Sequence, residues 1–312
     1  MTVLEAIQKS AEFLSRKGVE SPRLQTELLL AHMLKMPRMK LYLDFARSLS
    51  AAETDALREF VRRRGQREPL QHIIGSASFC GLEIAVNRDA LVPRPETELL
   101  AELGWEFLMT RGHALDLGTG TGCIAIALAV KCTGAKIIAT DMSADALALA
   151  KENAVKHQVS ERIEFLQGDG LAALAQGWGE RWGERPREPQ TNAASPSLGA
   201  SPHRFDLIIS NPPYIPSAEI ATLQPEVRDY DPRVALDGGA DGLDFYRRLA
   251  VEAKAFLKPD GKMMLEFGDG QAEALRNMFE AQKWIVEAVR EDYSHRPRIL
   301  TVKSSSSSSS SS

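Results

Sequence analysis

Apolar residues recur at helical spacing over the first 70 or so residues of the chain. Three runs carry this pattern, at Val3, Ile7 and Leu14, at Leu24, Leu28, Leu29 and Leu34, and at Leu57, Phe60 and Val61. Two helix starts, Thr2–Glu5 and Ser50–Glu53, have the spacing of a capping box. At a third, Ser21 places a capping hydroxyl before Pro22, a first-turn proline. Residues 1–71 are therefore expected to form a small helical bundle domain.

The pattern then changes to alternation. Leu82, Ile84 and Val86 alternate with polar or small residues, and Cys80-Gly81 offers a turn, which predicts a β-hairpin linker over residues 72–92. Pro93 and Pro95 break the chain before a further apolar helix.

Short apolar strands alternate with helices from His113 onward. The strand candidates are His113–Leu117, Ile137–Asp141, Ile163–Gln167, Phe205–Ser210, Lys262–Phe267, Ile285–Arg290 and Arg298–Val302. Such alternation predicts an α/β domain over residues 93–303, Rossmann-like, with a seven-stranded, mostly parallel sheet covered by helices on both faces. The last two strands are close in sequence, so an antiparallel edge pair is expected.

Two segments do not fit a compact fold. Residues 177–204 repeat Trp-Gly-Glu-Arg and then become rich in Pro, Ser, Ala and Asn, which predicts a mobile surface insertion. Residues 304–312 are all serine and predict a disordered tail. Neither segment is expected to carry chemistry.

Composition narrows the classes of function. Hydrophobic residues make up 44% of the chain and charged residues 26%, as in a globular protein, and the net charge of −4 makes direct nucleic-acid binding less expected. The three cysteines have no metal-ligand spacing, so we expect reduced thiols and no metal. No secretory signal and no apolar run of the ~20 residues that cross a bilayer is present, which predicts a cytoplasmic protein with no membrane partner.

A glycine-rich loop follows the first strand of the α/β region. Asp116-Leu-Gly118-Thr119-Gly120-Thr121-Gly122 opens a helix, where glycines allow close approach of a ligand and the helix N-terminus favours a carboxylate. The dinucleotide pattern G-x-G-x-x-G fails when counted from Gly118, but its relaxed form fits from Gly120, with an alanine in third place. The spacing alone therefore leaves a dinucleotide site or a tight structural turn open.

Two carboxylates end the next strands. Asp141 can accept hydrogen bonds from both hydroxyls of a ribose, or can act as a turn residue before Ser143. Asp169, in Gly168-Asp169-Gly170, can accept from an adenine amino group by the same geometry. Ligands bind at the carboxyl ends of strands in open α/β sheets, so the joint placement indicates a nucleotide-like cofactor.

The motif Asn211-Pro212-Pro213-Tyr214 follows the fourth strand of the sheet. Two prolines stiffen the backbone and leave carbonyl acceptors beside one amide side chain and one aromatic ring. The Asn211 oxygen and the Pro212 carbonyl can each accept one N–H of a planar –NH2 group, and Tyr214 can stack on that group. The alternative interpretation is a rigid loop, and hydride transfer has no use for such a loop.

These motifs resemble those of a known enzyme class. Asp116 with the glycine loop resembles the first motif of class I S-adenosylmethionine-dependent methyltransferases, and Asn211–Tyr214 resembles the signature of methyltransferases acting on amino or amide nitrogen. The resemblance implies S-adenosyl-L-methionine as methyl donor and S-adenosyl-L-homocysteine as product.

Further segments resemble the bacterial peptide chain release factor N5-glutamine methyltransferase family across about residues 2–302, apart from the insertion at 177–204. They are Ser21–Leu24, Glu27–His32, Glu68–Gly75, Val92–Glu98 and Leu236–Arg247. The resemblance implies methylation of the glutamine in the Gly-Gly-Gln motif of class I release factors, with the helical domain docking the release factor, and we expect a monomer.

The family's site residues are carried over by position. Gly118, Thr119, Gly120, Thr121, Gly122, Asp141 and Asn211 would contact the cofactor, and Asn211, Pro212, Pro213 and Tyr214 would hold the substrate glutamine. Asp169 and Gly170 would lie at the adenine, where the family often has an aromatic residue in place of Gly170. Glu96 and Thr97 would line the methionine end, or would simply cap a helix.

Three alternatives stay open. A sister enzyme acting on a glutamine of a large-subunit ribosomal protein would share the catalytic loop, a DNA or RNA amino-methyltransferase would need a basic groove, and a non-catalytic binding module would tolerate a broken loop.

An arginine cluster is either a solvated, paired helix end or a docking surface for an acidic partner. It comprises Arg58, Arg62, Arg63, Arg64 and Arg67.

Overall fold

A computed structural model describes residues 1–176 and 204–304, which form two compact units. The helical unit comprises residues 1–77, 85–88 and 221–231, and the sheet unit comprises the other described residues. The predicted insertion at 177–204 and the predicted serine tail lie, apart from one residue each, outside the described residues.

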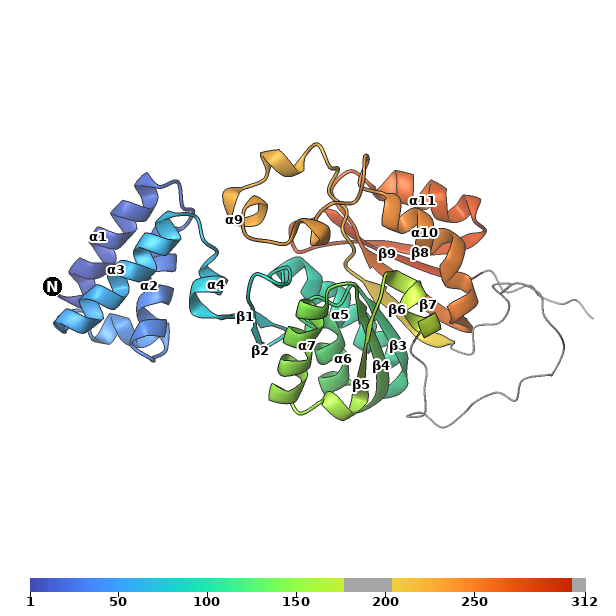
Figure 1. The fold of residues 1–312 in the computed structure, drawn as a ribbon, viewed down its shortest axis with the longest axis horizontal. Coiled ribbons are helices and arrows are strands. Elements are labelled where there is room, and N and C mark those ends of the chain that lie inside the picture. The colour runs from blue at the N-terminus through green and yellow to red at the C-terminus, as the bar shows by residue number, and fades with distance from the viewer. Residues whose placement is uncertain (177–203, 305–312) are drawn as a thin grey trace, which may run out of the picture. The chain divides into compact units, whose positions relative to one another are not determined.

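The helical unit is built around the three helices that the apolar spacing predicts. Its elements are α1 (Val3–Arg16), α2 (Pro22–Met33), η1 (Arg38–Leu43), α3 (Ala51–Gly65), α4 (Leu70–Ile74) and α9 (Pro225–Arg228). Figure 1 shows α1, α2 and α3 side by side in this unit, and Val3, Ile7, Leu14, Leu29 and Leu57 belong to one buried core cluster. Both predicted capping boxes are confirmed, because Thr2 accepts from the Glu5 N–H and Ser50 accepts from the Glu53 N–H.

The predicted cap at Ser21 is wrong. Ser21 has a left-handed backbone, with φ +46°, and its hydroxyl makes no hydrogen bond to the start of α2. A capping side chain needs an extended backbone to reach the N–H groups of the first turn, and Ser21 lacks that conformation. Pro22 at the first helical position still begins the helix.

The arginine cluster is paired within the helical unit. Arg58, Arg62 and Arg63 form ion pairs with Asp55, Glu59 and Glu68 on their own or the following segment. Arg64 and Arg67 both bind the carboxylate of Glu226 in α9, at 2.6 Å each. These last two pairs attach residues 221–231, which follow the Asn-Pro-Pro-Tyr motif along the chain, to the helical unit.

The hairpin between the first helices and the main sheet is confirmed. β1 (Ser76–Phe79) and β2 (Leu82–Ala85) form a two-stranded sheet. Cys80 and Gly81 join them, and both have positive φ, +51° and +77°. Two such residues match the type I′ turn that two-residue hairpins prefer.

Seven strands form the main sheet, and every predicted strand is present. They are β3 (Arg111–Leu117), β4 (Gly134–Asp141), β5 (Ile163–Gln167), β6 (Phe205–Ser210), β7 (Leu257–Glu266), β8 (Trp284–Glu291) and β9 (Pro297–Ser304). Their order is β5-β4-β3-β6-β7-β9-β8. The first five strands in this order pair in parallel, whereas β9 pairs antiparallel with both β7 and β8, as the edge prediction required.

Helices cover both faces of this sheet (Figure 1). On one face, α5 (Pro95–Leu108), α6 (Cys123–Lys131) and α7 (Ala144–Lys156) enclose a core that includes Ile137 and Ile209. On the other face, α8 (Ala173–Gln176), α10 (Asp244–Glu252) and α11 (Ala272–Ala281) enclose a core that includes Ile138 and Ile208. The neighbours Ile137/Ile138 and Ile208/Ile209 point to opposite faces, as strand geometry requires. Short 3-10 turns complete the fold: η2 (Ser160–Arg162), η3 (Gly170–Ala172), η4 (Ile220–Thr222), η5 (Arg233–Ala235) and η6 (Ala253–Phe256).

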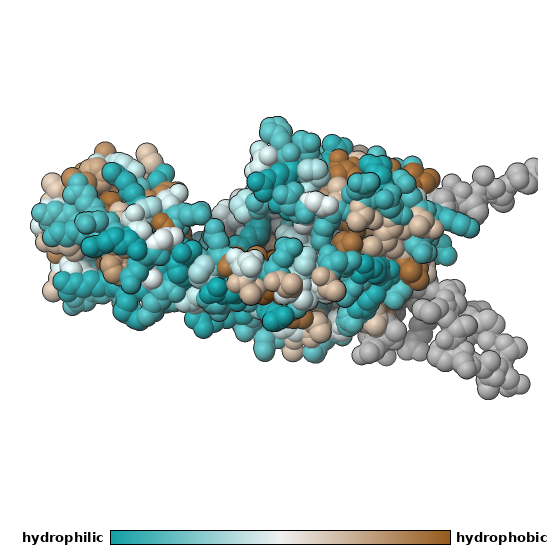
Figure 2. All heavy atoms as spheres, turned by 90° about the horizontal axis from the view of Figure 1, so that it is seen from above, coloured by the Kyte–Doolittle hydropathy of each residue, from teal (hydrophilic) through white to brown (hydrophobic). Residues whose placement is uncertain are grey.

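The outer surface is mostly hydrophilic on the face drawn in Figure 2, with smaller apolar patches. No helix in the described ranges is both long enough and apolar enough to span a bilayer.

Candidate active site

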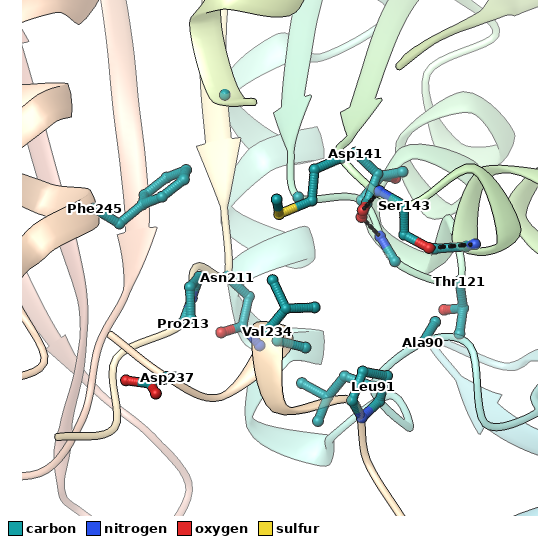
Figure 3. A pocket seen from close by; sticks show the side chains of 18 of the residues that line it. Ala90, Leu91, Thr121, Asp141, Ser143, Asn211, Pro213, Val234, Asp237 and Phe245 are labelled. Carbon is teal, nitrogen blue, oxygen red and sulfur yellow. Dashed lines mark hydrogen bonds between the residues drawn. The ribbon is translucent and has the colours of Figure 1, made fainter. Parts of the chain in front are cut away.

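A pocket of about 420 Å³ opens at the carboxyl ends of four neighbouring strands in the sheet unit. Segments following each strand line it: Gly118–Thr121 after β3, Asp141–Ser143 after β4, Gly168–Gly170 after β5, and Asn211 with Pro213 after β6. The volume is within the range of small-molecule sites, and this edge is where open α/β sheets bind ligands. Figure 3 shows Asp141 and Asn211 on different walls of this pocket.

Hydrogen bonds to the buried carboxylate of Asp116 hold the glycine loop in place. Asp116 is fully buried and accepts from the Thr119 hydroxyl at 2.6 Å and from the Ala125 N–H at 3.2 Å. Burial raises the pKa of Asp116 to about 7. Gly118 has φ +69°, and a Cβ there would meet no atom within 4 Å. The loop backbone is thus held rigid while open space remains above Gly118, which suits a ligand lying against it.

Asp141 has acceptor capacity left for a ligand. Its carboxylate accepts from the Gly120 N–H and from the Ser143 N–H, each at 2.9 Å. An ionised carboxylate offers about four acceptor positions. Asp141 is therefore a turn residue, as one interpretation held, and can still accept from two ribose hydroxyls at the pocket wall.

Asp169, which follows β5, forms an ion pair with Arg248, a residue to which the sequence analysis assigned no role. Both Asp169 oxygens accept from Nη1 of Arg248, at 2.9 Å, at an exposed rim of the pocket. A Cβ on Gly170 would lie 3.5 Å from Arg248 Nη2 and 3.9 Å from Phe245 Cε2. The predicted contact of Asp169 with adenine stays a prediction, and Phe245 supplies the aromatic ring beside Gly170.

The loop Asn211–Tyr214 divides into residues that line the pocket and residues that do not. Asn211 and Pro213 line it, and Asn211 Nδ2 donates to Thr97 Oγ1 at 3.0 Å. Pro212 is buried, and Tyr214 packs against the core on the α10–α11 face, where burial raises the pKa of its hydroxyl. Among the predicted residues, Gly122, Glu96, Pro212 and Tyr214 are not part of the pocket lining, whereas Thr97 is.

Several lining residues had no assigned role from the sequence. They include Leu91, Val92, Met142, Val234, Asp237, Phe245 and Arg248, and Figure 3 shows Phe245 on the wall across from Leu91. Val92, Asp237 and Phe245 fall inside segments that carried the family resemblance. The position of these three residues in the segments of family resemblance was the one indication in the sequence that they matter. The fold shows in addition that all three face the same cavity.

The sheet order with β9 antiparallel beside β7, the glycine loop after β3, the carboxylate at the end of β4 and Asn-Pro-Pro-Tyr after β6 together define a class I S-adenosylmethionine-dependent methyltransferase. Known proteins agree with this class. Residues 5–75 match the family described as PrmC N-terminal domain, and residues 110–294 match a methyltransferase domain family. A release factor glutamine methyltransferase of Geobacter sulfurreducens is 42% identical over 281 residues, covering 89% of this chain and 88% of the relative. One of Chlorobaculum tepidum is 41% identical over 308 residues, covering 96% of each. The chain therefore belongs to the release factor glutamine methyltransferase family.

A solved structure supports the fold independently. The hMettl16 catalytic domain is 16% identical to this chain, covering 72% of this chain and 76% of that one, with a TM-score of 0.50. At this identity the match bears on the fold alone.

Proposed function

We propose that this protein methylates N5 of the glutamine in the Gly-Gly-Gln motif of class I release factors, with S-adenosyl-L-methionine as donor. The observation that carries the proposal is the placement of the Asn211 side-chain amide in the wall of the pocket, directly after β6. Family membership supports the release factor as substrate, because relatives along nearly the whole chain carry that name.

The pocket residues suit the cofactor. Bound S-adenosyl-L-methionine would supply an electrophilic methyl group on a sulfonium, and S-adenosyl-L-homocysteine would be the product. The backbone of Gly118–Thr121 leads into the N-terminus of α6, which favours the carboxylate of the amino-acid part. Asp141 would accept from the ribose hydroxyls, and the Phe245 ring would pack against the adenine beside Gly170.

Asn211 would hold the nitrogen that receives the methyl group. Its Oδ1 and the Pro212 carbonyl would each accept one N–H of the substrate amide and would so direct the nitrogen toward the methyl group that the cofactor supplies. Such positioning can contribute up to ~7–11 kcal/mol of the barrier in ideal cases. The sulfonium already activates the methyl group, so no side chain has to deprotonate the amide before attack. As the nitrogen–carbon bond formed, the carbon–sulfur bond would break with its electron pair going to sulfur, and the amide proton would pass to solvent water.

The helical unit is proposed to dock the release factor, and the arginine cluster gives limited support. All five arginines pair with carboxylates of the helical unit, which favours the interpretation as a stabilised helix end. Charge reversal at Arg58, whose side chain is 74% exposed, tests docking without disturbing the buried pairs. A loss of activity on intact release factor, with none on a short Gly-Gly-Gln peptide, would favour docking; equal effects would exclude it.

A panel of acceptors tests the proposed function. Labelled methyl from S-adenosyl-L-methionine is offered separately to a class I release factor, to large-subunit ribosomal protein and to a DNA or RNA oligonucleotide. We expect label in the release factor alone, and none with Asn211→Ala. Label in ribosomal protein or in oligonucleotide, without label in the release factor, would contradict the proposal.

A further inference from the structure

Glu266 has a buried carboxylate to which the proposed reaction assigns no role. Glu266 ends β7, its residue is 2% exposed, and its Oε2 has no hydrogen-bond partner among the described residues. The Thr97 side chain, itself 3% exposed at the start of α5, hydrogen bonds to this carboxyl group. An ionisable group this deep in a protein is costly, so its presence calls for a role.

Thr97 connects the carboxylate to the catalytic loop. Thr97 Oγ1 accepts from Asn211 Nδ2 at 3.0 Å while the same side chain bonds to Glu266. The three residues come from α5, β7 and the loop after β6, and 169 positions of sequence separate Thr97 from Glu266. Together they form a hydrogen-bonded chain that runs from the pocket wall into the protein interior.

The chemistry of these groups fixes the direction of the chain. A hydroxyl has one proton to donate, and an ionised carboxylate can only accept. With Glu266 ionised, the Thr97 proton must point to Glu266, so Thr97 can only accept from Asn211. The amide nitrogen of Asn211 is then held by Thr97, and its oxygen is left to face a substrate N–H.

Protonation of Glu266 permits the opposite direction. A neutral carboxyl can donate to Thr97, and Thr97 can then donate to the Asn211 oxygen. The Asn211 amide would turn over and present its N–H groups to the substrate, where a donor would face a donor. The ionised state of one buried residue therefore selects the productive orientation of another.

We propose that Glu266 is a positioning residue that acts through Thr97 to orient the Asn211 amide as a hydrogen-bond acceptor for the substrate nitrogen. This inference rests on the proposed function, because it assigns Asn211 to a substrate N–H.

The surroundings of Glu266 place its titration near neutral pH. The pKa of Glu266 is raised to about 7, because burial and, to a smaller extent, the nearby Glu96 raise it more than Thr97, Arg298 and Arg94 lower it. The phenols of Tyr214 and Tyr246 also lie close to this charge, and the Tyr246 hydroxyl donates to the Glu266 backbone carbonyl at 2.6 Å. Since the ionised form is the productive one, turnover should rise with pH through a midpoint near 7.

Side-chain NMR of Asn211 tests the chain without any substrate. The Asn211 –NH2 signals are identified in the full-length protein by their loss in Asn211→Ala. We expect them to shift with pH with a midpoint near 7 in the wild type, and to lose that midpoint in Glu266→Gln and Thr97→Val. Signals that do not titrate in the wild type, or that keep the same midpoint in Glu266→Gln, would overturn the inference.

Kinetics with release factor supply the second test. Thr97→Val, which keeps the side-chain volume but removes the hydroxyl, should lower kcat at pH 8 by about tenfold, the effect of one lost hydrogen bond. Thr97→Ser should restore kcat to within about threefold, and Glu266→Gln should abolish the rise of kcat near pH 7. A wild-type kcat in Thr97→Val would refute the positioning role. If the wild type transferred no methyl to release factor, the proposed function would fail, and the NMR titration would still decide the hydrogen-bonded chain.

Discussion

Replacing Glu266 by Gln should stabilise the protein at alkaline pH, and the same change should abolish the rise of kcat near pH 7. In the unfolded chain a glutamate ionises at about its ordinary pKa of 4.5, whereas burial raises the pKa of Glu266 in the folded protein to about 7. The folded state therefore disfavours the ionised form. Below pH 4.5 Glu266 is neutral in both states and does not change the free energy of unfolding. As the pH rises from 4.5 to 7, the ionised carboxylate lowers the free energy of unfolding by an increasing amount. Above pH 7 this loss of stability has reached its full size.

The magnitude follows from the two pKa values. At about 1.4 kcal/mol for each pH unit between them, the ionised carboxylate costs about 3 kcal/mol of folding free energy above pH 7. Gln has nearly the same shape and keeps an oxygen that can accept from Thr97, but it never ionises. Glu266→Gln should thus be more stable than the wild type by about 3 kcal/mol at pH 8.5 and nearly equal to it at pH 4.5.

Urea unfolding of both proteins at several pH values measures this difference. Other carboxylates, including buried Asp116, contribute equally to both proteins and cancel in the comparison. Glu273→Gln, at an exposed position in α11, is the matched control and should change stability little at any pH. A stability difference for Glu266→Gln that is the same at pH 4.5 and 8.5, or that favours the wild type at pH 8.5, would show that folding does not raise the pKa of Glu266.

Three further predictions concern the pocket and the helical unit. Asn211→Ala should lower kcat by ~10²–10³ while changing the cofactor Kd less, and near wild-type turnover would exclude its role. Asp141→Ala should raise the cofactor Kd by about tenfold or more, as measured by calorimetry, because ribose hydrogen bonds are lost; an unchanged Kd would contradict the ribose assignment. Glu226→Ala leaves Arg64, 4% exposed, buried without its carboxylate and should cost about 3 kcal/mol in urea unfolding. Asp55→Ala, which breaks a highly exposed pair, should cost at most about 0.5 kcal/mol, and similar losses for the two variants would show that burial does not matter here.

The regular parts of the fold could be predicted from the sequence because they depend on local periodicity. The predicted ranges for β5 and β6 match the structure residue for residue, and the capping boxes at Thr2 and Ser50 form as their spacing indicates. The failure at Ser21 shows the limit of such signals. A suitable residue type does not cap a helix when the backbone before it takes a left-handed turn.

Site residues could be predicted only where a residue type suited to binding or catalysis lies at the carboxyl end of a predicted strand. Asp141 ends β4, Gly118 and Asn211 directly follow β3 and β6, and parallel strands bring those ends to one edge. Phe245 lies in a helix far along the chain from Gly170, and no period or spacing in the sequence indicates that the two residues meet.

Glu266 and the segment around Glu226 show a second limit. In the sequence, Glu266 is one more charged residue near the end of a predicted strand, and only its burial among α5, β7 and the loop Asn211–Tyr214 distinguishes it. Glu226 lies between that loop and the segment Leu236–Arg247 in the sequence, yet it bonds to Arg64 and Arg67 of the helical unit. Such long-range polar contacts depend on the completed fold and leave no local pattern.

The most direct test of the proposed function is mass mapping of the product formed from S-adenosyl-L-methionine and a purified class I release factor. We expect a single added methyl group, on the side chain of the Gly-Gly-Gln glutamine, and no product from a release factor in which that glutamine is replaced by alanine. A methyl group on any other residue, or continued methylation of the alanine variant, would contradict the assigned substrate.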